Sequence, residues 1–414
     1  MDVGGAVSFH RTPCAKISKG AAMISTVLLE NFLSFGGGGE KIILQPLNII
    51  IGTNGSGKSN FLEAFDLLRD APTDIQRPIL EGGGVLNWLH KGGHEKGSHA
   101  FLGFDIKNGL PNAEHELGYL LSFHEVANTF AIEYELIASP VLEEEAKMLT
   151  FYNSDGLHGS ISVNYENGRK VEPVADISPT QSILAQKRDT RYYPEITYLA
   201  NVFSKIKLYR NWTFGQYAPQ REPQRIDMKN DYLEPDCSNL CLVLNELRND
   251  LPTKRKILKE LQEFYEDVED YEITFVGSRA LIFFQERGLK TSVPATRLSD
   301  GTLRYLCLLS ILCHPNPPPL VCIEEPELGM HPDIIPNIAR LLTEASERCQ
   351  LIITTHSEIL IDAFTEKPEA ILIAEKTSDG TQLKRLSKEE LKPWLENYRL
   401  GNLWSSGEIG GTRW

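Results

Sequence analysis

The strongest constraint on the fold is the octapeptide Gly52–Ser59, GTNGSGKS, which matches the pattern G-x-x-x-x-G-K-[ST] at every fixed position. It follows the apolar run Leu47–Ile51 and precedes a segment with helical periodicity, so it joins a buried strand to a helix. In such a loop, glycines let backbone N–H groups surround phosphates, and the helix N-terminus adds partial positive charge. The sequence therefore predicts a nucleotide site within an α/β fold.

The polar residues of this loop have expected roles in phosphate chemistry. We expect Lys58 to reach the β- and γ-phosphates of ATP as a catalytic cation, and the hydroxyl of Ser59 to coordinate Mg²⁺. The plainer alternative is a glycine-rich turn without a ligand, and the presence of strand, motif and helix together argues against it. The predicted nucleotide-binding residues of this loop are Gly52, Thr53, Asn54, Gly55, Ser56, Gly57, Lys58, Ser59 and Asn60.

A second apolar segment, residues 320–327 with the sequence LVCIEEPE, ends in acidic residues. A strand that ends in two carboxylates would place them at the carboxyl edge of a parallel sheet, beside the phosphate loop. We predict that Glu324 holds Mg²⁺ and that Glu325 orients and deprotonates the attacking water. The alternative is a solvated acidic turn. Glu327 receives no firm role, because the turn at Pro326 could expose it.

Two further motifs follow the same logic. His356 comes directly after an apolar strand, 31 residues after Glu325, which predicts an imidazole at the same sheet edge in contact with the γ-phosphate. The sequence RLSDGT, residues 297–302, opens an amphipathic helix for which a serine is a natural cap. The same helix start could also bind an anion, and we predict that it contacts a nucleotide held by another subunit. The predicted contact residues are Ser299, Asp300 and Gly301.

The hydrophobic pattern divides the chain into four parts. From residue 300 onward helices and strands alternate, which implies a parallel sheet wrapped by helices. Residues 72–98 and 209–235 are expected to be loop. Consecutive strands are expected at 99–107, 117–123, 128–138 and 146–164, and helices at 192–208, 236–249 and 253–266. The predicted parts are a disordered or non-native tail, 1–22; the N-terminal half of an ATPase head with a β meander, 23–150; an inserted lobe, 151–290; and the C-terminal half of the head, 291–414.

Composition limits the class of protein. The net charge is −14, from 42 basic and 56 acidic side chains, which argues against a protein that coats nucleic acid through bulk charge. No run of 18 apolar residues occurs, so the sequence offers no membrane-spanning helix. The seven cysteines contain no C-x-x-C pair and lie mostly in apolar runs. We interpret them as buried free thiols in a reducing cytoplasm.

Two local clusters suggest further sites. His90, His94 and His99 could hold a metal, although the Gly- and Lys-rich sequence between them favours a mobile loop. Residues 187–229 contain nine Lys or Arg and four Asp or Glu, interleaved with aromatic side chains, which suits contact with DNA. The alternative is that the aromatic residues are core and the cations are solvated or paired with acids. The candidate DNA contacts are Lys205, Lys207, Arg210 and Arg221.

The order and wording of these motifs resemble the ABC-type ATPase heads of the RecF/SMC class: phosphate loop, LSDGT signature, EEPE box and TTHS. The chain is most similar to compact bacterial RecF-like and OLD-like AAA-type ATPases. The segments that carry this resemblance include YRNWTFGQYAPQR at 209–221, RLSDGTLRYLCLLSILCHP at 297–315 and EEPELGMHPD at 324–333. The implied fold is a P-loop ABC-ATPase head with a mixed sheet, an antiparallel β meander and an inserted helical lobe.

The resemblance implies a head-to-head homodimer that encloses two ATP molecules with Mg²⁺. Each site would combine the phosphate loop and acids of one chain with Ser299 and Gly301 of the other, and residues 328–331 would form the D-loop that touches across the dimer. Asp300 stands where transporter ATPases have Gly, and Glu324 where Asp is commoner, so the resemblance allows for slow turnover. Gln76 is a weak candidate for the glutamine that completes the metal shell.

The sequence narrows the functions that such a head could serve. A long coiled-coil arm is excluded, because the residues between Ser59 and Leu298 are strand-rich and broken by Gly and Pro. OLD-type nucleases carry a Toprim domain, and no acidic D-x-D run follows His356, so we expect any nuclease or toxin to be a separate effector chain. We therefore expect an ATPase in DNA repair or anti-phage defence. The alternatives are a switch or scaffold of a toxin complex with little turnover, and a transporter-type ATPase subunit.

Overall fold

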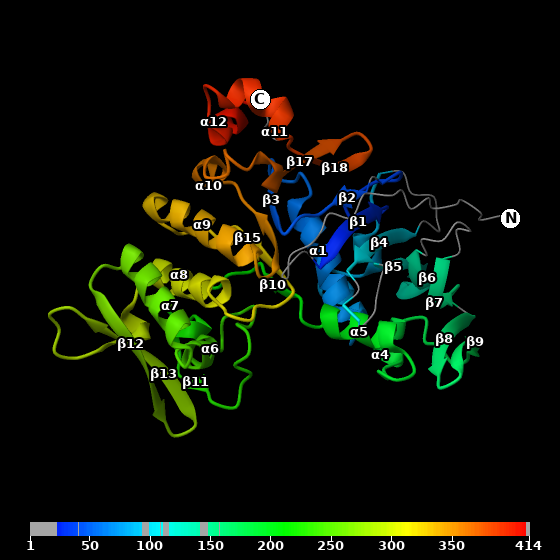
Figure 1. Cartoon of the computed structure of the whole chain (residues 1–414), viewed down its shortest axis with the longest axis horizontal. Helices are drawn as coiled ribbons and strands as arrows, with labels where there is room; N and C mark the ends of the chain where they lie inside the picture. The colour runs from blue at the N-terminus through cyan, green and yellow to red at the C-terminus, as the bar shows by residue number, and fades with distance from the viewer. Residues whose placement is uncertain are drawn as a thin grey trace.

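The computed structural model describes residues 23–39, 41–92, 99–107, 109–110, 116–140, 148–156 and 158–410. The predicted tail and His94 lie outside these ranges. Within them the chain forms three sheets, and Figure 1 shows the central sheet between a large antiparallel sheet on one side and a helical lobe on the other. The helices are α1 Lys58–Asp70, α2 Gln76–Glu81, α3 Val85–Trp88, α4 Ile183–Gln186, α5 Pro194–Phe203, α6 Leu240–Leu247, α7 Leu251–Phe264, α8 Asp300–Leu312, α9 Ile335–Ser346, α10 Glu358–Asp362, α11 Lys388–Leu395 and α12 Leu400–Ser405.

The central sheet has the strand order β10-β15-β16-β3-β17-β18, in which the first five strands are parallel and β18 is antiparallel to β17. Its register aligns Glu324 with Thr354 and Thr354 with Ile50, so the carboxyl ends of three neighbouring strands meet at one edge. The strands are β3 Leu47–Ile51, β10 Lys207–Tyr209, β15 Leu320–Glu324, β16 Gln350–Thr354, β17 Ile371–Thr377 and β18 Gly380–Arg385.

The central sheet separates two hydrophobic cores. Successive side chains of a strand point to opposite faces. In β3, Ile49 and Ile51 therefore join the core formed with α6, α7, α8 and α9, while Ile50 joins the core formed with α1, α5 and the antiparallel sheet. Every residue of β3 and β16 is buried, as expected for strands covered on both faces. Because both faces of the sheet are covered by apolar cores, the polar residues gather at the carboxyl edge of its strands.

The large sheet is an antiparallel meander with the order β2-β1-β4-β5-β6-β7-β8-β9. It confirms the predicted meander and extends it, because the expected boundary at residue 150 falls inside β7 and the sheet continues to residue 174. Its strands are β1 Ile24–Glu30, β2 Ile42–Ile43, β4 Ala100–Ile106, β5 Leu117–Val126, β6 Thr129–Pro140, β7 Met148–Ser154, β8 Gly159–Tyr165 and β9 Gly168–Val174.

The helical lobe carries the small third sheet, in which β12 (Val268–Val276) and β13 (Arg279–Glu286) form an antiparallel hairpin. Two short strands flank β13: β11 (Gln224–Arg225) and β14 (Val293–Pro294). The expected loop at 72–98 was wrong in part, because α2 and α3 form there against α1 and the meander. The expected helix 192–208 ends at residue 203, and its last residues enter the central sheet as β10.

Candidate nucleotide-binding site

A pocket of about 320 Å³ lies at the carboxyl edge of the central sheet. Its walls come from the phosphate loop, from the end of β15 and from the turn after β16. The structure therefore brings together three motifs that are far apart in the sequence. The residues that line the pocket are Asn54, Gly55, Gly57, Lys58, Ser59, Asn60, Glu324, Glu325 and His356.

The phosphate loop is held in shape by backbone conformation and by the β17–β18 turn. Gly57 caps α1 with φ of 101°, a left-handed conformation that favours glycine. A Cβ at Gly57 would lie 2.3 Å from Oγ1 of Thr381, which itself donates to the carbonyl oxygen of Ser56 at 2.9 Å. The hydroxyl of Ser56 is buried and has no hydrogen-bond partner among the described residues. A loop held in this way keeps its concave backbone available to a ligand.

Lys58 bends back over the loop. Its ammonium donates to the carbonyl oxygens of Gly52 at 2.8 Å and Thr53 at 3.0 Å. Burial lowers the pKa of Lys58 to about 8, although Glu325 and Glu324 act in the opposite direction. A buried ammonium with only neutral acceptors gains from a phosphate, because an anion compensates its charge more fully than carbonyl groups do.

Ser59 and Glu324 meet directly, since the Ser59 hydroxyl donates to Oε1 of Glu324. The other carboxylate oxygen, Oε2, lies 3.4 Å from Nε of Arg210. The indole N–H of Trp212 donates to the main-chain carbonyl of Glu324 at 3.1 Å. A hydroxyl and a carboxylate in direct contact form the kind of all-oxygen donor set that Mg²⁺ prefers.

Glu325 occupies an unusual backbone conformation, with φ of 47°. Its N–H donates to the carbonyl of Thr354 at 2.9 Å, which turns the chain sharply at the end of β15. Such conformations cost on the order of 1–3 kcal/mol and occur often at functional sites. Nε2 of His356 lies 3.6 Å from Oε1 of Glu325. Burial and the nearby Lys58 ammonium lower the pKa of His356, which keeps the imidazole neutral near pH 7.

The expectation that the Pro326 turn could expose Glu327 was wrong. Its carboxylate turns inward, where Oε1 accepts from the hydroxyl of Thr355 and, at 3.2 Å, from the N–H of His356. Burial raises the pKa of Glu327. This contact connects the acidic turn after β15 to the turn after β16 and so fixes the position of His356 relative to Glu325. The spacing of the two turns along the chain gave no signal for it.

The predicted signature residues begin α8 but do not line the pocket. Ser299 caps the helix, and its hydroxyl accepts from the N–H of Thr302 at 3.0 Å. Asp300 accepts from the guanidinium of Arg221 at 2.6 Å and from the N–H of Gly215 at 3.0 Å. Gly301 lies next in the helix. These residues therefore do not line the nucleotide site of their own chain.

Three of the four candidate DNA contacts pair with acidic side chains of the chain itself, and the interpretation as a DNA surface stays a prediction. Lys207 contacts Glu234 at 3.1 Å, Arg221 pairs with Asp300, and Arg210 contacts three carboxylates. Only Lys205 is an exposed cation of this set. The neighbouring aromatic side chains are mostly core or stacked on one another, as Tyr209, Trp212 and Phe214 are. The alternative of core aromatics and paired arginines describes this segment better.

The remaining candidates find no support as ligands. Among the described residues no group of three or more His, Cys, Asp or Glu side chains is placed to hold a metal ion; His90 bonds the carbonyl of Leu33, and His99 pairs with Glu133. Gln76 begins α2, beyond the far end of α1, and does not line the pocket. All six cysteines of the described ranges are buried and free. In the part of the chain that the structure describes, no helix has the length and apolar character to cross a membrane.

Residues 47–118 and 177–362, more than half of the chain, match the AAA_21 family, described as an AAA domain, putative AbiEii toxin, of a type IV TA system. The chain belongs to this family. The match spans the phosphate loop, the acidic strand end and the His356 turn, and it omits most of the antiparallel meander. AAA_21 membership makes the pocket part of a P-loop ATPase head.

Comparisons with individual proteins agree with this assignment. A segment of 81 residues is 37% identical to an OLD nuclease of Thermus scotoductus, covering 19% of this chain and only 15% of that protein. A crystal structure of the SmcHead bound to the C-winged helix domain of ScpA matches 89% of this chain and 99% of its own, with a TM-score of 0.51 and 14% identity. The fold of the AAA_21 chain is therefore that of an SMC-type, ABC-class ATPase head, as predicted.

Two residues that the sequence analysis did not place in the site, Arg210 and Thr381, contact its edge. Arg210 was assigned to a DNA surface, and Thr381 was not singled out. A cation directly after a short apolar strand was the available signal for Arg210, because the carboxyl end of a parallel strand reaches the same edge as Glu324. Nothing in the sequence around Thr381 pointed to the phosphate loop.

Proposed function

We propose that this chain binds and hydrolyses ATP, as one half of a dimeric head that encloses two nucleotides. The observation that carries the proposal is the contact of Ser59 with Glu324, beside Lys58, Glu325 and His356 in one pocket. These groups supply a phosphate cradle, a metal donor pair and a base within one site, and together they suit hydrolysis of a nucleoside triphosphate.

The residues of the site fit ATP and Mg²⁺. The unpartnered hydroxyl of Ser56 and the open space at Gly55 leave room for phosphate oxygens over the loop. Ser59 and Glu324 would hold Mg²⁺, which when bound neutralises charge on the β- and γ-phosphates. Lys58 exchanges its carbonyl acceptors for phosphate oxygens, and Glu325 accepts the proton of the attacking water. His356, neutral beside Glu325, donates to the γ-phosphate or to the water.

The second half of each site would come from a second copy of the chain. Ser299 and Gly301, at the start of α8, do not line the pocket of their own chain, which leaves them for contact with a nucleotide held by the second copy. Leu328, in the turn after Glu325, is 54% exposed and would lie at the same interface. A site completed in this way hydrolyses ATP only when two chains meet, so turnover reports on assembly.

The wider role that we propose is a DNA-related process, in repair or anti-phage defence, with a separately encoded effector such as a nuclease. The OLD nuclease relative supports this role, although it matches over a short segment. The family description favours a second candidate, a switch within a toxin complex that binds ATP and turns over little. Both roles use the same pocket and differ in how often it completes a cycle.

ATP hydrolysis by the purified chain, measured with and without duplex DNA, tests the proposal. We expect the turnover per chain to rise with protein concentration in the wild type and to be lost in Glu325→Gln. Binding of ATP without turnover under all conditions would favour the switch, and absence of both would overturn the proposal. Co-expression with the products of neighbouring genes then tests the effector: an ATP-dependent complex with a nuclease or toxin supports it, and a complex with neither weighs against it.

A further inference from the structure

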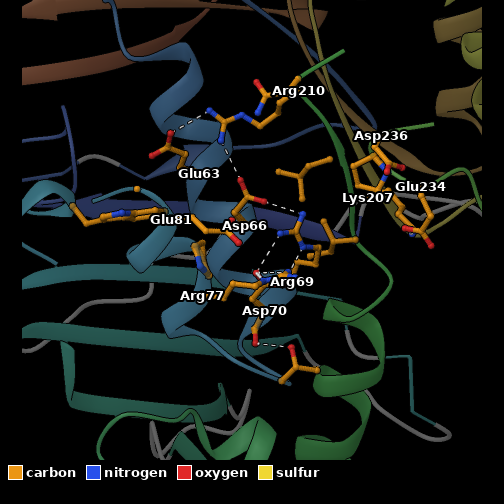
Figure 2. Close-up of a pocket in the computed structure, with 18 of the residues that line it drawn as sticks. Glu63, Asp66, Arg69, Asp70, Arg77, Glu81, Lys207, Arg210, Glu234 and Asp236 are labelled. Atoms are coloured by element: carbon orange, nitrogen blue, oxygen red, sulfur yellow. Dashed lines mark hydrogen bonds and ion pairs between the residues drawn. The ribbon is translucent and has the colours of Figure 1, made fainter. Parts of the chain in front are cut away.

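Arg210 connects the phosphate-loop helix to the end of β15. Its guanidinium donates to Glu63 at 3.1 Å and to Asp66 at 3.1 Å, and its Nε lies 3.4 Å from Oε2 of Glu324. Figure 2 shows the first two contacts, from a side chain that reaches across to two acids one turn apart on α1. The arginine side chain is only 20% exposed, so it is a built-in contact and not a surface charge.

The carboxylate of Glu324 is thereby held from two sides. The hydroxyl of Ser59 occupies Oε1, and Arg210 faces Oε2. Trp212, two residues after Arg210, fixes the main chain of Glu324 through its indole N–H. The segment 210–212 therefore determines both where the end of β15 lies and how its carboxylate is turned. With Arg210 in place, Oε1 and the Ser59 hydroxyl lie in direct hydrogen-bond contact.

Charged side chains beyond Arg210 hold one of its anchors, Asp66, and continue the network along α1. Asp66 contacts Arg69 at 2.9 Å, and Asp70 contacts Arg69 at 3.1 Å and Arg77 at 2.7 Å. Figure 2 shows these pairs following α1 along a cleft of about 900 Å³. Arg210 thus rests on a network of paired charged side chains, which is the kind of support that a positioning contact requires.

We propose that Arg210 is a positioning residue for Glu324, which it orients so that Oε1 and the Ser59 hydroxyl form a single Mg²⁺ site. The inference rests on the proposed function. The positive charge of Arg210 has an opposing effect, because a cation near the site repels Mg²⁺. Charge alone predicts tighter Mg²⁺ binding when Arg210 is removed, whereas orientation predicts weaker binding. Outer contacts of this kind typically change metal affinity by about 10–100-fold, so we expect orientation to prevail.

Mg²⁺-dependent binding of a fluorescent, non-hydrolysable ATP analogue separates these effects without measuring turnover. In Arg210→Met we expect the Mg²⁺ concentration for half-saturation to rise roughly 10–100-fold, while binding in EDTA changes less than about twofold. Lys207→Met is the matched control, because Lys207 is a half-buried cation, 16% exposed, that pairs with Glu234 away from the metal residues. This control should leave the half-saturation point unchanged.

Arg210→Lys keeps the charge but cannot contact three carboxylates at once, and it decides the question if the methionine variant does not fold. We expect its half-saturation point to lie between those of the wild type and Arg210→Met. A lower Mg²⁺ requirement in either variant, or a shift equal to that of Lys207→Met, would overturn the inference and leave the proposed function standing. A wild-type chain that binds no analogue would overturn both.

Discussion

The starts of two helices, α1 and α8, were both predicted to contact phosphate, and they differ in how their backbone groups are satisfied. Among the described residues no side chain caps α1, which begins at a left-handed glycine, Gly57. α8 is capped by Ser299, and the next residue, Asp300, is held by Arg221. The first helix start is open toward a ligand, whereas the second is satisfied by its own chain.

This difference separates two kinds of binding element. The start of α1 is shaped by φ angles that only glycine adopts at low cost, and its N–H groups are available without rearrangement. The start of α8 would have to exchange the Ser299 contact for a phosphate oxygen. In the proposed dimer, α1 therefore supplies affinity within one chain, and α8 adds contacts that form on assembly.

The largest effect is expected from Glu325→Gln, which should lower turnover by about 10²–10⁴-fold because the proton acceptor is lost while the shape is kept. Nucleotide binding at the α1 side should persist, so ATP should hold the chain as a dimer. Steady-state hydrolysis and light scattering with ATP provide the measurements. A monomer by scattering in excess ATP would contradict the role of α8, even if turnover falls.

A pair of alanine substitutions compares the two helix starts directly. Gly57→Ala combines a φ of 101° with a Cβ that would lie 2.3 Å from Thr381, so it should destabilise the fold by about 1–3 kcal/mol and abolish binding of the ATP analogue. In Gly301→Ala the new Cβ would lie 3.3 Å from the carbonyl oxygen of Gly329, a tight contact that a small shift of the exposed turn at Gly329 relieves, so the chain should fold and bind nucleotide much as the wild type does.

Denaturant unfolding and analogue titration measure both variants. We expect Gly301→Ala to lose ATP-induced dimerisation and turnover, because the added methyl group would lie 3.8 Å from the hydroxyl oxygen of Ser299 and crowd the proposed phosphate contact of α8. Equal loss of nucleotide binding in the two variants would remove the distinction between the helix starts.

A smaller effect is expected from Ser299→Ala. Loss of the helix cap should cost about 1 kcal/mol of stability, and loss of the proposed hydroxyl contact to a charged phosphate should lower turnover at least about tenfold. Ser387 caps α11 in the same way and far from the pocket, so Ser387→Ala is the control for the cap alone. If both variants lose stability and neither loses turnover, Ser299 is only a cap.

The sequence predicted the parts of the site that are local in the chain. The loop 52–59, the acids after β15 and the imidazole after β16 could be found because strand periodicity shows where each strand ends, and parallel strands end at one edge. The relation of Ser59 to Glu324 follows from that geometry. The alternation after residue 300 likewise gave the correct parallel arrangement.

Contacts between distant segments could not be predicted in this way. Arg210 follows β10, a strand of three residues that continues the hydrophobic pattern of α5, so the one local signal for its place at the sheet edge was weak. Its charge suggested a surface, whereas its partners on α1 lie about 150 residues earlier in the chain. Strands β17 and β18 brought Thr381 under the phosphate loop by pairing that no single-sequence pattern reveals.

The smallest expected effect concerns the pH dependence of the residues that one chain contributes to its own pocket. The pKa of His356 lies below the ordinary 6.5 because of burial and the Lys58 ammonium, so the imidazole gains its proton only in acid. Once charged, it would pair with Glu325, 3.6 Å away, and hinder that carboxylate as a base.

Turnover at saturating ATP should therefore fall as pH decreases, with a midpoint below 6.5, and should change only a few-fold between pH 8 and 6.5. In His356→Asn the residual turnover should persist to lower pH than in the wild type, because no imidazolium can form beside Glu325. A fall in wild-type turnover with a midpoint above pH 6.5, or the same midpoint in His356→Asn, would show that His356 does not control the base. The helix start α8 carries no histidine, so Ser299→Ala should keep the wild-type midpoint.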